Sequence, residues 1–191
     1  MVMNLPTWLT LFRLALVPVV IAALLMPLAG ANVVAAAGFV IAMVTDWLDG
    51  YLARRWDVES DFGAFLDPVA DKLLVCSVLV VLVSRDPRIV VALAATVIIC
   101  RELTVSALRE WMAELGQRGV VAVGAAGKYK TTIQMAAILI MIFALDLQNW
   151  LYDLGVGLLV LAAVLTIWSM VLYMRQAWPI LAGQVDRNAD R

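Results

Sequence analysis

The sequence predicts an all-α integral membrane protein with six transmembrane helices. Of its 191 residues, 64% are hydrophobic and only 15% are charged, and the mean hydropathy is +0.96, well above the balance of a soluble domain. The apolar residues gather in runs of helical length, and these runs lack the alternation of a membrane β-barrel. Helices are therefore the spanning structures that this sequence predicts.

Each predicted helix is an apolar stretch that can cross a hydrocarbon core about 30 Å thick. We expect the first to be retained and not cleaved as a signal peptide, because no Lys or Arg precedes Arg13, which itself lies inside the apolar stretch. The connections are short except at 55–66 and 109–130, and the first part of 109–130 is expected to form an interfacial amphipathic turn or helix extension. We expect one domain over 1–183 and a polar tail over 184–191. The six spans are roughly 8–28, 33–54, 67–84, 88–109, 128–147 and 150–174.

Basic residues are unequally divided between the two sides of the predicted bundle. One side has only Arg85 and Arg88. The positive-inside rule therefore places both termini in the cytoplasm. The net charge of −1 and the lack of a basic block argue against nucleic acid as a partner. The other side holds Arg54, Arg55, Arg109, Arg118, Lys128, Lys130, Arg175, Arg187 and Arg191.

Seven carboxylates stand out between residues 45 and 72 of this apolar chain. Asp46 and Asp49 are three residues apart, and Asp67 and Asp71 are four apart, so each pair shares one helix face. Carboxylates at membrane depth require a compensating cation. The chain has no His, so the carboxylates are expected to bind hard divalent ions such as Mg²⁺ or Mn²⁺. The remaining three, which we expect in a solvated loop, are Asp57, Glu59 and Asp61.

Small and basic residues beside these carboxylates indicate a phosphate ligand. Gly50 and Ala53 flank Asp49, and Gly63 precedes Asp67, so the backbone can approach a ligand closely. Arg54 can hold a phosphate group by charge-assisted hydrogen bonds. Paired metals, an arginine and close backbone together predict a diphosphate site.

The spacing of these residues resembles the signature of the CDP-alcohol phosphatidyltransferases. In this sequence the signature positions are Asp46, Asp49, Gly50, Ala53, Arg54, Gly63, Asp67 and Asp71. The stretches "NLPTWLTLFR", "RELTVSALREWMAELG" and "GKYKTT" extend the resemblance over most of the chain. It implies a homodimer in the bacterial cytoplasmic membrane, with a polar active-site cavity that faces the cytoplasm and holds two Mg²⁺ or Mn²⁺ ions.

The resemblance also implies a role for individual residues. Asp46, Asp49, Asp67 and Asp71 ligate the metals, and Asp71 also acts as general base. The CDP part of CDP-diacylglycerol contacts Thr10, Gly50, Arg54 and Ser60. The implied reaction is attack by the 1-hydroxyl of sn-glycerol 3-phosphate on the β-phosphorus, with release of CMP.

The acceptor's phosphate needs further cations, and alternatives stay open here. Lys128 and Lys130 lie in "GAAGKYKTT", which lacks the residues of a phosphate-binding P-loop. They and Arg175 are acceptor candidates or positive-inside anchors, while Arg101 forms a structural ion pair with Glu102 or joins the candidates. Inositol 1-phosphate or a second lipid is an alternative acceptor, and a divalent-cation transporter is an alternative of another class. The full set of acceptor candidates is Arg13, Arg101, Arg109, Lys128, Lys130 and Arg175.

Overall fold

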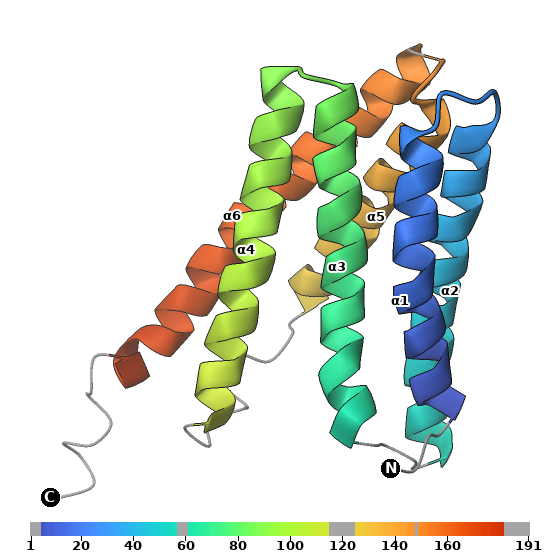
Figure 1. The fold of residues 1–191 in the computed structure, drawn as a ribbon. Coiled ribbons are helices and arrows are strands. Elements are labelled where there is room, and N and C mark those ends of the chain that lie inside the picture. The colour runs from blue at the N-terminus through green and yellow to red at the C-terminus, as the bar shows by residue number, and fades with distance from the viewer. Residues whose placement is uncertain (1–4, 57–60, 115–124, 148, 182–191) are drawn as a thin grey trace, which may run out of the picture. The chain divides into compact units, whose positions relative to one another are not determined.

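The computed structural model describes residues 5–56, 61–114, 125–147 and 149–181. Within these ranges the chain forms six α-helices and the prediction of an all-α fold is confirmed (Figure 1). Ser60, two of the expected loop carboxylates and the predicted tail lie outside the described residues. The helices are α1 (Leu5–Leu25), α2 (Ala31–Trp56), α3 (Asp61–Arg85), α4 (Ile89–Glu114), α5 (Ala125–Ala144) and α6 (Trp150–Leu181).

Helix boundaries differ from the predicted spans where local chemistry overrides hydropathy. The first span was expected to reach residue 28, but α1 ends at Leu25, because the residue before Pro27 is biased away from helical geometry. Gly30 then turns the chain with a φ of 84°, a conformation that favours glycine. At the other extreme, α4 continues to Glu114, as expected for a helix extension beyond 109.

Four helices are long and apolar enough to cross a membrane, judged over the described part of the chain. The apolar part of α5, Lys130–Ala144, is shorter, and α3 carries Asp71, Lys72 and Arg85. Six spans were expected, and four of the six helices meet this criterion over the described residues: Thr7–Leu25, Ala31–Leu52, Ile89–Ala113 and Trp150–Arg175. These apolar helices make the chain a multi-pass membrane protein.

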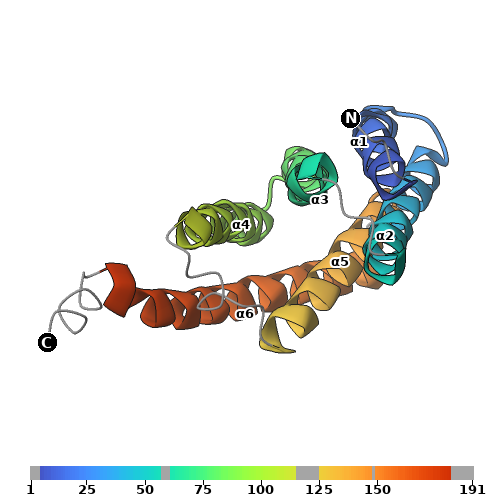
Figure 2. The same cartoon turned by 90° about the horizontal axis from the view of Figure 1, so that it is seen from below.

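The chain divides into two compact units, and the prediction of one domain over 1–183 stays a prediction. Unit 1 comprises Met1–Arg88 and Ala137–Val156, and unit 2 comprises Ile89–Ala136 and Gly157–Arg191. In unit 1, α1 packs against both α2 and α3 (Figures 1 and 2). A Cβ added to Gly38 of α2 would lie 2.8 Å from Val20 of α1, so this glycine permits the close approach of the two helices.

Unit 2 has its own apolar core where α4 meets α6. Val105, Leu108 and Met112 of α4 pack with Tyr173 of α6, and all four are buried. Large apolar side chains elsewhere on these helices are exposed, including Leu103 at 58%. In a membrane protein such outward apolar surface faces lipid.

Candidate functional site

In unit 1, Asp46 and Asp49 converge on a single positive group. Arg13 of α1 donates through Nη2 to Asp49, and its Nη1 lies 2.6 Å from Oδ1 of Asp46. Arg13 is completely buried and Asp49 is 2% exposed, whereas the Asp46 side chain is half-exposed. The prediction that the two carboxylates share one face of α2 is therefore confirmed. Their partner was not predicted, because Arg13 was considered only for the acceptor.

The second pair of predicted metal ligands is described only in part. Asp71 lies in α3 and is partly buried, while the side chain of Asp67 is outside the described residues. Over the part of the chain that is described, no group of three or more His, Cys, Asp or Glu residues is close enough to hold a metal ion. The four-carboxylate centre accordingly remains a prediction.

The predicted contacts of the CDP moiety are likewise described in part. Thr10 is 1% exposed and lies on α1 close to Arg13, so it belongs to the same buried polar region. Gly50 directly follows Asp49 on α2 and is partly buried. Arg54 also lies in α2, but its side chain is outside the described set.

A second charged cluster lies in unit 2 around Glu102 of α4. Its Oε1 accepts from Lys130 of α5 at 3.2 Å and from Arg101 at 3.0 Å. Lys130 is 1% exposed and Arg101 is 8% exposed. The expected ion pair between Arg101 and Glu102 is confirmed, but Glu102 also holds Lys130, which the sequence did not indicate.

Tyr173 of α6 gathers two arginines beside this cluster. The guanidinium groups of Arg101 and Arg109 lie 5.8 and 5.9 Å from the centre of its ring, within cation–π range. Arg101 Nη2 also reaches Ser169 at 3.5 Å, whereas its buried Nε has no hydrogen-bond partner among the described residues. Two cations thus contact the carboxylate of Glu102, and Arg109 shares the ring of Tyr173 with Arg101, an arrangement whose excess of positive charge suits an anion.

The other two acceptor candidates are placed less closely. Arg175 is exposed and borders an apolar cavity of about 360 Å³ beside Trp178 of α6. Lys128 lies in the first turn of α5, but its side chain is outside the described residues. Neither is shown in contact with the cluster around Glu102.

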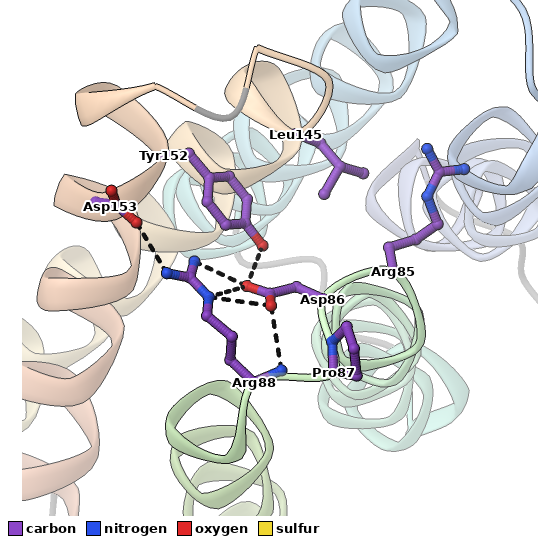
Figure 3. A pocket seen from close by; sticks show the side chains of 7 residues that line it. All are labelled: Arg85, Asp86, Pro87, Arg88, Leu145, Tyr152 and Asp153. Carbon is purple, nitrogen blue, oxygen red and sulfur yellow. Dashed lines mark hydrogen bonds and ion pairs between the residues drawn. The ribbon is translucent and has the colours of Figure 1, made fainter.

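A third polar network ties the α3–α4 connection to the start of α6, within unit 1 (Figure 3). Asp86 accepts from the Nε of Arg88 at 2.9 Å and from the hydroxyl of Tyr152 at 2.9 Å. Arg88 Nη1 also reaches Asp153 at 2.9 Å. The backbone N–H of Arg88 donates to Asp86 at 3.2 Å, so this aspartate forms a local turn just before α4. These groups line a cavity of about 350 Å³.

The pKa values in this connection follow from those contacts. Burial alone would raise the pKa of Asp86, but the hydrogen bonds from Arg88 and Tyr152 outweigh it and hold that pKa below its usual value. Hydrogen bonds to Asp153 and then Asp86 raise the pKa of Arg88. Both groups are therefore charged at neutral pH. Sequence reasoning missed this network and recorded Arg88 only as a charge on the sparsely basic side.

Comparison with known proteins identifies the family of the chain. The family model for CDP-alcohol phosphatidyltransferase matches residues 3–174. The chain belongs to the CDP-alcohol phosphatidyltransferase family. It is therefore a membrane enzyme, and the resemblance carried by the motif from Asp46 to Asp71 is confirmed as a family relationship.

Several curated relatives of this phosphatidyltransferase bear one name, CDP-diacylglycerol--glycerol-3-phosphate 3-phosphatidyltransferase. The protein from Salmonella choleraesuis (strain SC-B67) is 48% identical over 174 residues, which are 91% of this chain and 94% of the relative. The protein from Sodalis glossinidius is 47% identical over 177 residues, covering 93% and 96%. That from Shigella flexneri is 47% identical over 181 residues, covering 95% and 98%.

Proposed function

We propose that this enzyme transfers the phosphatidyl group of CDP-diacylglycerol to sn-glycerol 3-phosphate, forming phosphatidylglycerophosphate and CMP. The observation that carries the proposal is the convergence of Asp46 and Asp49 on one buried positive group, inside the family's signature. The shared name of relatives that match more than nine-tenths of the chain supports glycerol 3-phosphate as the acceptor.

Asp46, Asp49, Asp67 and Asp71 are the residues that would hold two divalent cations, Mg²⁺ or Mn²⁺. Their fit is supported by Arg13, whose guanidinium acts as a stand-in cation between the first two carboxylates, and by a purely oxygen donor set. When bound, the cations neutralise the diphosphate and stabilise the charge that develops on the attacking and leaving oxygens.

The chain's own residues position the reactants and move one proton. Thr10, Gly50, Arg54 and Ser60 bind the CDP moiety, with Gly50 allowing close backbone approach. Asp71 accepts the proton of the acceptor's 1-hydroxyl while the oxygen of that hydroxyl forms its bond to the β-phosphorus. The bond from that phosphorus to the CMP oxygen breaks, and CMP leaves with the electron pair. Because phosphoryl transfer has a loose transition state, orientation and charge neutralisation account for most of the acceleration.

The basic cluster of unit 2 binds the phosphate of the acceptor. Lys130 and Arg101 share one carboxylate, Glu102, and Arg109 lies beside Arg101 on the ring of Tyr173. The Nε of Arg101, which has no hydrogen-bond partner among the described residues, offers a further buried donor. Lys128 of α5 and Arg175 of α6 are further candidates for binding this phosphate. Charge-assisted hydrogen bonds from such groups are the strongest that a phosphate monoester can receive.

Measurement of CMP release with a panel of acceptors tests the proposal. Purified enzyme in micelles containing CDP-diacylglycerol and Mn²⁺ should release CMP with glycerol 3-phosphate and not with inositol 1-phosphate. Identification of the lipid product by mass spectrometry distinguishes transfer from hydrolysis. Equal or faster release with inositol 1-phosphate would reject the proposed acceptor while leaving the family chemistry in place.

We also propose that both termini and the active site face the cytoplasm and that the enzyme is a homodimer in the bacterial inner membrane. The scarcity of basic residues around Arg85 and Arg88 supports the orientation, and family membership supports the dimer. Accessibility of single introduced cysteines to a membrane-impermeant maleimide tests the first, and light scattering of the purified protein tests the second.

A further inference from the structure

We infer that Arg13 is an internal counter-ion that holds Asp46 and Asp49 before metal binds and competes with the divalent cation for them. This inference rests on the proposed metal site. It assigns to Arg13 a positioning role toward that site, in place of the role in acceptor binding that the sequence left open.

The burial of Arg13 requires such a partner. Its side chain is 1% exposed, and the Asp49 side chain beside it is 3% exposed. A charge removed from water at this depth is tolerated only when it is paired. The ion pairs to Asp46 and Asp49 supply that pairing between α1 and α2, while the Arg13 Nε has no hydrogen-bond partner among the described residues. The guanidinium is therefore held chiefly by these two carboxylates.

The same contacts oppose a metal ion. Arg13 lies 2.6 Å from one oxygen of Asp46 and donates to one oxygen of Asp49. Mg²⁺ binds carboxylate oxygen at about 2.0–2.1 Å, so a cation on either carboxylate would lie close to the guanidinium and share the carboxylate's lone pairs with it. Whichever oxygens the cation takes, it also meets a positive charge in a region of low dielectric. We therefore expect metal binding to loosen the ion pairs, and the observed affinity is the intrinsic affinity multiplied by the fraction of protein in which they are loose.

If the role of Arg13 were purely structural, its substitution would change the metal affinity in the opposite direction. If Arg13 only kept Asp46 and Asp49 correctly oriented, its loss would scatter the carboxylates and weaken metal binding. If it competes, its loss strengthens metal binding while lowering the stability of the metal-free protein. The sign of the change in metal affinity separates the two roles.

Mn²⁺ titration of the EDTA-treated, dialysed protein, with free Mn²⁺ measured by electron paramagnetic resonance, provides this test. We expect R13Q to lower the Mn²⁺ Kd about tenfold, equivalent to about 1.4 kcal/mol. R85Q is the matched control, because Arg85 is the last residue of α3 and pairs with exposed Asp146. The Mn²⁺ Kd of R85Q should equal that of the wild type. The Tm should be lower for metal-free R13Q and should rise more on addition of Mn²⁺ than that of the wild type.

R13K keeps the inference testable should R13Q fail to fold. A lysine ammonium lacks the fork that bridges two carboxylates, so its Mn²⁺ Kd should lie between those of the other two proteins. If the wild type binds Mn²⁺ and both substitutions leave its Kd unchanged or raise it, the inference about Arg13 is wrong while the proposed metal site stands. Absence of Mn²⁺ binding in every variant overturns the proposed metal site, and this inference with it.

Discussion

Replacing Lys130 with methionine tests whether the basic cluster of unit 2 binds the acceptor. Lys130 is almost fully buried, and its ammonium lies 3.2 Å from Glu102. Methionine preserves most of the stem while removing the charge. Glu102 keeps its contact with Arg101 at 3.0 Å, so the substitution does not leave that carboxylate unpaired. The variant is expected to fold.

The expected magnitude follows from the loss of one charge-assisted hydrogen bond. Such a bond contributes about 1.5–3 kcal/mol. At about 1.4 kcal/mol for each factor of ten, K130M should raise the KM for glycerol 3-phosphate about 10- to 100-fold. The KM for CDP-diacylglycerol should change less than about twofold, because that substrate makes no contact with Lys130 in the proposed site.

Initial rates of CMP release, with each substrate varied in turn, measure both constants. Gln134 offers the matched control, since it lies one turn further along α5 and is 3% exposed but uncharged. Q134M places the same side chain in the same helix and should leave the KM for the acceptor near the wild-type value. An equal rise in both KM values for K130M would refute acceptor binding and indicate a structural role for Lys130.

Three further predictions concern the proposed base, the metals and the α3–α4 connection. D71N should abolish CMP release while the protein keeps its helical circular dichroism; turnover near the wild-type rate would reject Asp71 as the base. Addition of EDTA should stop CMP release and Mn²⁺ should restore it, whereas a rate unaffected by EDTA would exclude the proposed centre. D86N should lower the unfolding free energy by about 2–4 kcal/mol, because it weakens a mostly buried, multiply bonded carboxylate; D153N, at an exposed ion pair, should cost at most about 1 kcal/mol. Since the pKa of Asp86 is lowered in the folded state, its stabilisation is present at neutral pH and is lost as the pH falls below about 4. Unfolding in detergent at pH 7 and pH 3 should show the D86N deficit shrinking at the lower pH, and a constant deficit would contradict the pKa argument.

The helices could be predicted from sequence because each is encoded locally. An apolar stretch long enough to cross a membrane has few alternatives to a helix, and six such stretches correspond to α1 through α6. Their ends were less certain, because hydropathy ignores turn chemistry such as Pro27 and the positive φ of Gly30. The early start of α3 at Asp61 was missed for a related reason, since its first turns carry charge and do not resemble a span.

The candidate site was predictable only to the extent that it lies within one helix. The spacing of Asp46 and Asp49 implies a shared face, and their common contact with Arg13 confirms it. The partners across helices were not encoded in any local spacing. Arg13 and Asp49 are 36 residues apart, Glu102 and Lys130 are 28 apart, and Asp86 and Tyr152 are 66 apart. Such pairs depend on how helices pack, which one sequence does not specify.

The three polar clusters follow one electrostatic rule that composition already required. In a chain with so few charged residues, a buried charge must find an opposite charge within the protein. Arg13 meets Asp46 and Asp49, Lys130 meets Glu102, and Asp86 meets Arg88. The clusters differ in what remains after pairing. In the Asp86 network, hydrogen bonds and ion pairs link Asp86, Arg88, Tyr152 and Asp153, and two carboxylates share one arginine. The cluster around Glu102 has cations in excess, and the pair on α2 has carboxylates in excess of Arg13. Excess negative charge suits metal ions, and excess positive charge suits a phosphate ester. The pair on α2 and the Asp86 network therefore carry the same excess of one carboxylate, and what distinguishes the pair on α2 is its position in the family's signature.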